Sequence, residues 1–212
     1  MGSEMCIRDR EDIDPMAIGF KYINWIEPEK KETITSYAQR MAAGISESSG
    51  GITLIGHSLG GIITQEISTL VNIDKIILIS SIKSRKELPF HFKTIKPLGL
   101  QRLFSKGLTQ KTIKYWGKAH GYESLKEQAL VKDMVGGQSN AYLQWALRQL
   151  SIWEAPKVPS STKIFQVHGD ADKTFPIKLI SKPDRVVENA GHFMVYKRAD
   201  MITKVIIEEL GK

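Results

Sequence analysis

The sequence predicts an α/β fold: a mostly parallel sheet, flanked by helices, with a helical cap inserted between its strands. Two observations favour this fold class. Short apolar runs alternate with stretches of helical spacing near both ends of the chain, and such alternation is typical of parallel βαβ units. Between them, residues 83–159 carry no strand signal, and roughly seventy-five residues are too many for an ordinary connection.

The first half of the predicted sheet comes before this insertion. Residues 20–24 form an apolar and aromatic run, which predicts a strand. Apolar residues at helical spacing over 34–45, directly after a threonine suited to an N-cap, predict a helix. Residues 52–55 and 75–80 are apolar runs typical of buried strands, and a helix is expected over 60–70 between them.

The insertion is expected to hold helices. The clearest follows Ser139 and carries apolar residues on one face as far as Trp153. Residues 110–116 and 124–134 are weaker helical stretches. The core then resumes with a strand at 163–167, a strand at 185–188 and a closing helix at 199–210. The predicted domains are therefore a core of residues 11–82 and 160–212 and a helical cap of residues 83–159.

The composition excludes several classes of protein. The chain has 212 residues, of which 42% are hydrophobic and 25% charged, which excludes a disordered or fibrous protein. Its one cysteine excludes an internal disulfide and a Cys-rich zinc site. The longest apolar runs are too short for a membrane span. We expect no cofactor and no metal, and a cytoplasmic location unless an N-terminal signal has been lost.

The positive charge of the chain is concentrated in one region. The net charge is +7, and residues 83–118 hold ten lysines and arginines against one acidic residue, Glu87. That region therefore carries +9, and the rest of the chain sums to −2. A solvated, solubilising face explains this distribution. An anionic partner or a membrane surface is the alternative.

The N-terminal residues 1–10 fit no helical or alternating period. Their run from residue 4 to residue 10 resembles the translation of a transposase-adapter end used in DNA library preparation. We therefore expect a non-native tail, in which Cys6 is not native and an upstream stretch has been lost. A genuine, irregular tail is the alternative.

Residues 56–60 read Gly-His-Ser-Leu-Gly and match G-x-S-x-G. The pattern follows a predicted buried strand and opens a predicted helix, which is the setting of a nucleophile elbow. A tight turn explains both flanking glycines, and it lifts Ser58 to the carboxyl end of the sheet, where open α/β sheets bind ligands. A glycine-rich turn with a capping serine is the alternative.

A nucleophilic serine needs a base and an orienting acid. Of the five histidines, His192 is favoured as the base, because its loop joins the last strand to the last helix and emerges at the edge of the sheet that carries Ser58. The others are placed in the elbow itself, in the insertion, or in a turn: His57, His91, His120 and His168. Asp172 and Asp170 both follow the strand at 163–167, and Asp172 is favoured because Asp170 more easily caps the turn.

These motifs, in the order Ser, Asp, His, resemble the α/β-hydrolase family, most closely its small bacterial members, over roughly residues 18–212. The resemblance implies hydrolysis of an ester or related acyl bond through an acyl-enzyme. Ser58 would attack, His192 would take and return the proton, and Asp172 would hold the imidazole. The backbone N–H of Leu59 would be one oxyanion donor. The implied partner is a small-molecule ester, and no nucleic acid is expected; the oligomeric state is left open.

One departure from that family concerns the oxyanion hole. Its second donor comes from a glycine-containing loop after an earlier strand, and none precedes Phe20. We therefore carry three alternatives: an enzyme inactivated by loss of that strand and loop, a non-catalytic ligand-binding protein of the same fold, and a basic surface-binding protein using residues 83–118. Apolar residues of the insertion predict either an apolar acyl or alcohol site or the core of the cap: Leu88, Phe90, Leu98, Leu100, Leu103 and Trp116.

Overall fold

A computed structural model describes residues 20–45, 51–119, 122 and 124–211, and of Trp116, Lys118 and Ala119 it describes the backbone alone. The expected non-native tail with Cys6, and also His120, lie outside the described residues. None of the described helices is both long enough and apolar enough to cross a bilayer.

The described sheet has four parallel strands in the order β1-β2-β3-β4. They are β1 (Thr53–His57), β2 (Lys75–Ile79), β3 (Lys163–Gly169) and β4 (Arg185–Val187). β2 and β3 are direct neighbours although the whole insertion separates them in sequence. All four strands therefore end at one edge, with the loops that follow them side by side.

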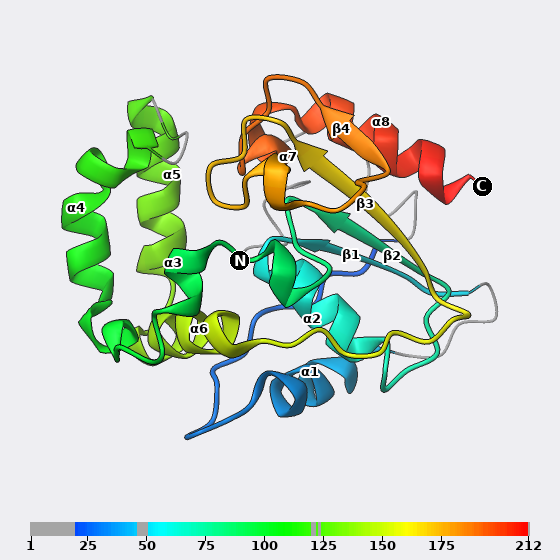
Figure 1. The fold of residues 1–212 in the computed structure, drawn as a ribbon, viewed down its shortest axis with the longest axis horizontal. Coiled ribbons are helices and arrows are strands. Elements are labelled where there is room, and N and C mark those ends of the chain that lie inside the picture. The colour runs from blue at the N-terminus through cyan, green and yellow to red at the C-terminus, as the bar shows by residue number, and fades with distance from the viewer. Residues whose placement is uncertain (1–19, 46–50, 120–121, 123, 212) are drawn as a thin grey trace.

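Helices cover both faces of the sheet (Figure 1). α1 (Ile34–Ala42) and α2 (Leu59–Ile67) pack on one face, and α7 (Met194–Lys197) and α8 (Ala199–Leu210) pack on the other. Alternate residues of β2 serve the two layers, because successive side chains of a strand point to opposite faces. Ile76 and Leu78 join the α1–α2 core, whereas Ile77 and Ile79 join the core under α8.

In its described part the insertion consists of helices joined by loops, with no strand. After the 3-10 turn η2 (Arg85–Glu87) it contains four α-helices and a second 3-10 turn, which are α3 (Phe90–Lys93), η3 (Leu100–Leu103), α4 (Lys106–Ala119), α5 (Leu125–Gly136) and α6 (Asn140–Ile152). α4 and α5 pair with each other beside the sheet, and α6 leads back toward α1 (Figure 1). A further 3-10 turn, η4 (Ile177–Leu179), follows β3.

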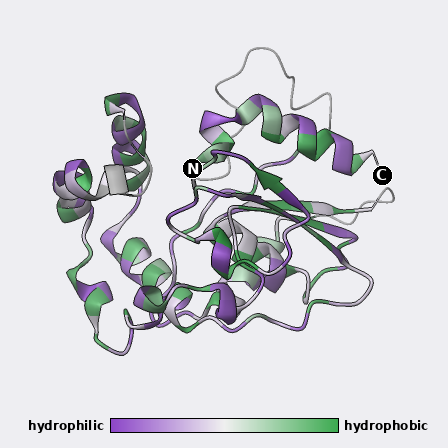
Figure 2. Ribbon diagram, turned by 45° about the horizontal axis from the view of Figure 1, so that its top comes forward, coloured by the Kyte–Doolittle hydropathy of each residue, from purple (hydrophilic) through white to green (hydrophobic). Residues whose placement is uncertain are grey.

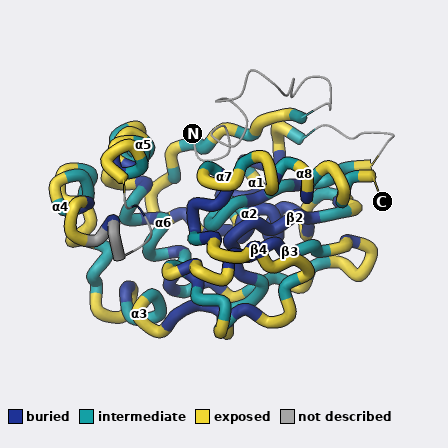
Figure 3. Tube along the Cα trace, turned by 90° about the horizontal axis from the view of Figure 1, so that it is seen from above, coloured by how far each residue is buried: buried dark blue, intermediate teal, exposed yellow. Residues whose placement is uncertain are grey.

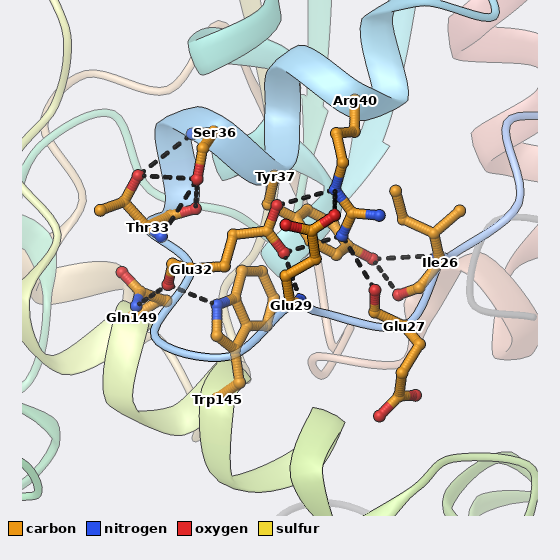
Figure 4. Close-up of polar contacts among 10 residues, drawn as sticks. All are labelled: Ile26, Glu27, Glu29, Glu32, Thr33, Ser36, Tyr37, Arg40, Trp145 and Gln149. Atoms are coloured by element: carbon orange, nitrogen blue, oxygen red, sulfur yellow. Dashed lines mark hydrogen bonds and ion pairs between the residues drawn. The ribbon is translucent and has the colours of Figure 1, made fainter.

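Buried contacts tie α6 to the segment before α1 (Figure 4). The indole of Trp145 and the side-chain amide of Gln149 each donate a hydrogen bond to the carbonyl oxygen of Glu32, at 2.9 Å. The carboxylate of Glu32 in turn binds the guanidinium of Arg40 at 2.7 and 2.8 Å. The Tyr37 ring packs 4.3 Å from that of Trp145. One end of the insertion is thereby fixed to the core.

The sheet and the α4–α5 pair differ in how far their residues are buried. In Figure 3 most of β2, the end of β3 and most of α2 are dark blue (buried), whereas α4 and α5 are mostly teal or yellow. In Figure 2 hydrophobic and hydrophilic residues alternate along α4 and α5. This difference is expected, because a helix pair that stands beside the sheet buries one stripe, whereas a central parallel strand is covered on both faces.

The predicted strand at residues 20–24 is wrong. These residues run without strand pairing, and Trp25 then stacks on Tyr37 at 6.5 Å and meets Tyr142 edge-on at 5.8 Å. The hydroxyl of Tyr37 accepts from the N–H of Ile26 and donates to its carbonyl. A strand needs a neighbour to pair with, and the ring of Trp25, directly after these residues, packs instead against α1 and α6.

The other predicted strands and helices are confirmed, with ends that shift by a few residues. The threonine before α1 is a capping residue: the Oγ of Thr33 accepts from the N–H of Ser36. Ser124 and Ser139 cap α5 and α6 in the same way. The four-residue helices α3 and α7 carry too few residues to show a period and were not predicted.

Candidate active site

Ser58 sits on the sharp turn between β1 and α2 with φ 53° and ψ −120°. A non-glycine residue at positive φ is strained, and such strain costs about 1–3 kcal/mol unless the surroundings hold it. Here they do: the N–H of Ser58 donates to the carbonyl of Ile79 at 3.0 Å, and the hydroxyl of Ser81 donates to the Ser58 carbonyl at 2.7 Å. The turn has the geometry of a nucleophile elbow.

The glycines around Ser58 differ in how much space a side chain would have. A Cβ on Gly56 would lie 2.5 Å from the backbone of Gly60 and Gly61, so no side chain fits there. A Cβ on Gly60 would come no closer than 4.0 Å to Trp25, so the expectation that crowding requires Gly60 is wrong. The second crowded position is Gly61, where a Cβ would lie 2.5 Å from the Ser81 hydroxyl, because α2 crosses β2 closely at this point.

The three predicted site residues meet in one hydrogen-bonded line. Nε2 of His192 lies 2.8 Å from the Oγ of Ser58, and Nδ1 lies 2.8 Å from Oδ2 of Asp172. The side chains come from loops after β1, β3 and β4, whose carboxyl ends share one edge of the sheet. Asp170 is exposed, whereas Asp172 is only 3% exposed.

The loop after β3 fixes the Asp172 carboxylate. Its Oδ1 accepts the backbone N–H groups of Thr174 and Phe175 at 2.8 and 2.9 Å. Burial raises the pKa of Asp172, but the charge and hydrogen bond of His192 and the backbone hydrogen bond outweigh it, so the pKa lies below its ordinary value. The group is therefore an ionised acceptor at neutral pH, and it favours a proton on Nδ1 of His192.

Two further histidines pack around this line. His168 is fully buried, and its Nε2 donates to the carbonyl of Phe175 at 2.7 Å and lies 3.5 Å from Oδ2 of Asp172. Burial lowers its pKa. Nε2 of His57 lies 2.9 Å from the carbonyl oxygen of His192 and must carry its proton, because a carbonyl only accepts. Burial, followed by the charge of His192, lowers the pKa of His57 to about 4.

These two contacts were not predicted from sequence. The sequence analysis places His57 in the elbow and His168 in a turn, without a partner for either. His168 does bridge the turn that carries Asp172. The role of His57 depends on the approach of the loop after β4, and no local pattern in the sequence reports it.

Aromatic side chains border the His192 imidazole. The Phe175 ring lies 5.3 Å from it, edge to face, and the Phe92 ring of α3 lies 6.0 Å from Phe175. Phe193 contacts Tyr122, a residue of the insertion, at 5.6 Å. The insertion therefore reaches the site at two places.

The apolar residues of the insertion that were considered for a substrate site lie in different places. Leu88 is buried in the α1–α2 core, Leu100 is half-buried, and Phe90, Leu98 and Leu103 are exposed. The side chain of Trp116 lies outside the described part.

Leu59 is the first residue of α2. The first N–H groups of a helix have no acceptor within it. The Leu59 N–H, which is next to Ser58 in the chain, is therefore not used in a hydrogen bond within α2. In the family that the sequence resembles, the second donor comes from a loop that would precede residue 20. The sequence offers no such loop there, and residues 1–19 lie outside the described part. In the described part of the chain, no three His, Cys, Asp or Glu side chains are grouped closely enough to hold a metal ion.

Solved structures share this arrangement of strands and helices. An esterase from Exiguobacterium antarcticum is similar with a TM-score of 0.63 at 15% identity, over 85% of this chain and 74% of its own. A bromoperoxidase from Bacillus anthracis reaches 0.62 at 17% identity, over 92% and 78%. A thermophilic esterase from Thermogutta terrifontis reaches 0.59 at 16% identity, over 84% and 72%. No protein-family model and no curated protein matches the sequence. The likeness shows the α/β-hydrolase fold.

Proposed function

We propose that this protein is a serine hydrolase that cleaves a carboxylic ester, or a related acyl bond, through an acyl-enzyme. The observation that carries the proposal is the line of hydrogen bonds from Asp172 through His192 to Ser58. Such a line makes a serine hydroxyl nucleophilic at neutral pH. The esterases among the similar structures support ester chemistry at the level of the fold.

In the first half-reaction the Oγ of Ser58 attacks the carbonyl carbon while Nε2 of His192 takes the hydroxyl proton. The tetrahedral intermediate collapses as His192 gives that proton to the leaving alcohol, and the acyl group stays on Ser58. In the second half-reaction His192 takes a proton from water, whose oxygen attacks the acyl carbon. The proton returns to Ser58 when the acid leaves.

Asp172 and Leu59 supply the electrostatics of this reaction. The Asp172 carboxylate holds the imidazole with Nδ1 protonated and stabilises the imidazolium that forms when His192 takes a proton. The Leu59 N–H would donate a hydrogen bond to the substrate oxygen on which negative charge develops. One such donor is worth about 100- to 1000-fold in turnover.

The proposal includes the domain organisation. Residues 11–82 and 160–212 form the catalytic core, and residues 83–159 form a cap whose aromatic residues, with Phe92 beside Phe175, border the site. This apolar border favours a small-molecule ester with an apolar acyl or alcohol part.

A fluorophosphonate probe tests the proposal, because it labels an activated serine without knowledge of the substrate. We expect one label per chain, lost in Ser58→Ala and strongly reduced in His192→Ala and Asp172→Ala. Ser160→Ala is the matched control, since Ser160 is exposed and remote from the three residues. Asp170→Ala should label as the parent does.

The same experiment separates the alternatives. A folded chain that takes no label would contradict the proposal and favour a ligand-binding protein or an inactivated enzyme. Label on a residue other than Ser58 would contradict the assignment of the nucleophile. Near-ultraviolet circular dichroism of each variant shows whether the chain is folded.

A further inference from the structure

The insertion exposes large apolar side chains on consecutive elements from α3 to α4. Most of the side chain is in contact with solvent in four of them, and half in the fifth. We call this set the α3–α4 surface: Phe90 at 79% exposure, Leu98 at 67%, Leu103 at 66%, Leu108 at 50% and Tyr115 at 73%. Scattered apolar residues are normal on a protein surface, but a concentration of this kind marks an interaction site.

The charge of the same stretch has one sign. Residues 88–122 contain seven basic residues and no acidic residue. Four of the seven are exposed in the structure: Lys96, Arg102, Lys111 and Lys114. A solubilising surface usually mixes both signs, whereas a basic surface with interspersed apolar side chains matches an anionic partner that also accepts hydrocarbon.

α4 displays this combination on a single helix face. Leu108, Lys111 and Tyr115 are spaced at three and four residues, so they share one side of the helix. The opposite side packs on α5 through the buried Ile113. The ammonium group of Lys114 lies 4.9 Å from the centre of the Tyr115 ring. Leucine, tyrosine and lysine on one exposed face are typical of a helix that lies at a membrane–water interface.

The α3–α4 surface adjoins the candidate active site. Phe90 and Phe92 belong to the same short helix, α3, which lies between the α4–α5 pair and the sheet in Figure 1. Phe90 is exposed, whereas Phe92 contacts Phe175, which in turn contacts the imidazole of His192. A molecule held at the surface is therefore one helix away from the site.

We propose that the α3–α4 surface docks on an anionic lipid surface and that the substrate is an amphiphilic ester taken from it. The part about the substrate rests on the proposed hydrolase function, whereas the docking does not. Lipid is favoured over nucleic acid because three of the five apolar residues are leucines, which fit hydrocarbon but are poor platforms for base stacking. A second copy is disfavoured because a two-fold interface would bring surfaces of the same charge together.

Vesicle sedimentation tests the docking. The full chain carries Ser58→Ala, so that no lipid is hydrolysed, and the vesicles are phosphatidylcholine alone or mixed with phosphatidylglycerol. We expect partition into the mixed vesicles, little into the neutral ones, and release at high salt. Lys96→Glu with Lys111→Glu should lower the partition by about 25-fold, at about fivefold for each lysine. Leu98→Ser with Leu103→Ser should lower it by about tenfold or more.

Matched pairs elsewhere on the molecule control for charge and hydrophobicity. Lys157→Glu with Lys163→Glu and Met201→Ser with Ile207→Ser change exposed residues outside the α3–α4 surface, and should bind as the parent does. Equal binding to neutral vesicles, or equal loss in test and control pairs, would overturn the proposal.

Other occupants of the surface give different results. A dimer in light scattering that the leucine pair dissociates, or binding to single-stranded DNA with none to vesicles, would each contradict lipid docking. Docking without fluorophosphonate label on the chain with Ser58 intact would uphold the surface and remove the hydrolase, so the two proposals fail separately.

Discussion

Two parts of the insertion, α6 and the α4–α5 pair, meet the core in different ways. α6 is fixed by buried groups: Trp145 and Gln149 donate to Glu32, and the indole of Trp153 donates to the carboxylate of Glu66 at 2.8 Å. The described contacts of the α4–α5 pair with the core lie at α7 and the loop before it. Tyr122 meets Phe193, and Lys197 of α7 pairs with Glu127 of α5 at 2.9 Å.

We expect the two sets of contacts to have different effects, one on the stability of the fold and the other on the candidate active site. The α6 contacts hold a large apolar cluster together, so their loss should lower the stability of the whole fold. The α4–α5 contacts touch the loop that carries His192, so their loss should act on the site and cost less stability. Four substitutions test this comparison, from the largest expected effect to the smallest.

Trp145→Ala should have the largest effect. The substitution empties a buried site and leaves the carbonyl of Glu32 with one donor fewer, and a buried tryptophan is worth about 3–5 kcal/mol. Urea denaturation measures this as a fall in the free energy of unfolding. Tyr115→Ala, on the exposed side of α4, should change it by at most about 0.5 kcal/mol. Equal losses in the two variants would contradict a fixed α6.

Arg40→Met should destabilise the protein in a pH-dependent way. The hydrogen bond of Arg40, against the opposing effect of burial, lowers the pKa of Glu32 below its ordinary value of 4.5. A depressed carboxyl pKa contributes stability above the unfolded value and loses it as the pH falls through the folded value. We expect a loss of about 1–2 kcal/mol at neutral pH, because Arg40 is partly exposed.

The pH dependence is the sharper part of that test. Parent and variant should converge in urea denaturation as the pH falls below 4.5, since Glu32 becomes protonated in both. Arg40→Lys should retain part of the effect, because it keeps the charge but loses the paired N–H donors. A difference that stays constant down to acid pH would mean that Arg40 acts through packing on Tyr37 instead.

Much of this architecture could be predicted because it depends on local patterns. Central parallel strands are buried on both faces, so they appear as apolar runs, and Ser58 is marked by the strand, turn and helix around it. The chain order then places Asp172 and His192 after later strands of the same sheet. These residues were expected together for topological reasons, and they lie within hydrogen-bond distance.

What could not be predicted depends on contacts between distant segments. An apolar run such as residues 20–24 fits an extended chain packed on helices as well as it fits a strand. Gly60 and Gly61 are adjacent in sequence, and only the crossing of α2 over β2 shows which one is crowded. The bond from His57 to the His192 carbonyl joins residues 135 positions apart.

Tyr122→Ala should act on the site more than on the fold. It removes the ring that packs on Phe193, next to His192, from a small cluster rather than from the main core. We expect the rate of fluorophosphonate labelling to fall about tenfold, since small displacements of catalytic groups are costly. The loss of unfolding free energy should stay below that of Trp145→Ala. The reverse ranking would show that the α4–α5 pair is a structural support.

His57 holds the same loop from the side of the core, and its replacement should have the smallest effect of the four. His57→Leu removes the donor to the His192 carbonyl, whereas His57→Gln offers a neutral amide donor in its place. We expect labelling to slow by about fivefold in the leucine variant, as the loss of one neutral hydrogen bond of about 1 kcal/mol implies, and to recover in the glutamine variant. Because the pKa of His57 is about 4, the imidazole is neutral between about pH 6 and pH 8. The ratio of the labelling rate of His57→Leu to that of the parent should therefore stay the same across this range. A ratio that varies with pH there would mean that His57 acts through its charge, and slow labelling in both variants would mean that the imidazole is needed for its shape.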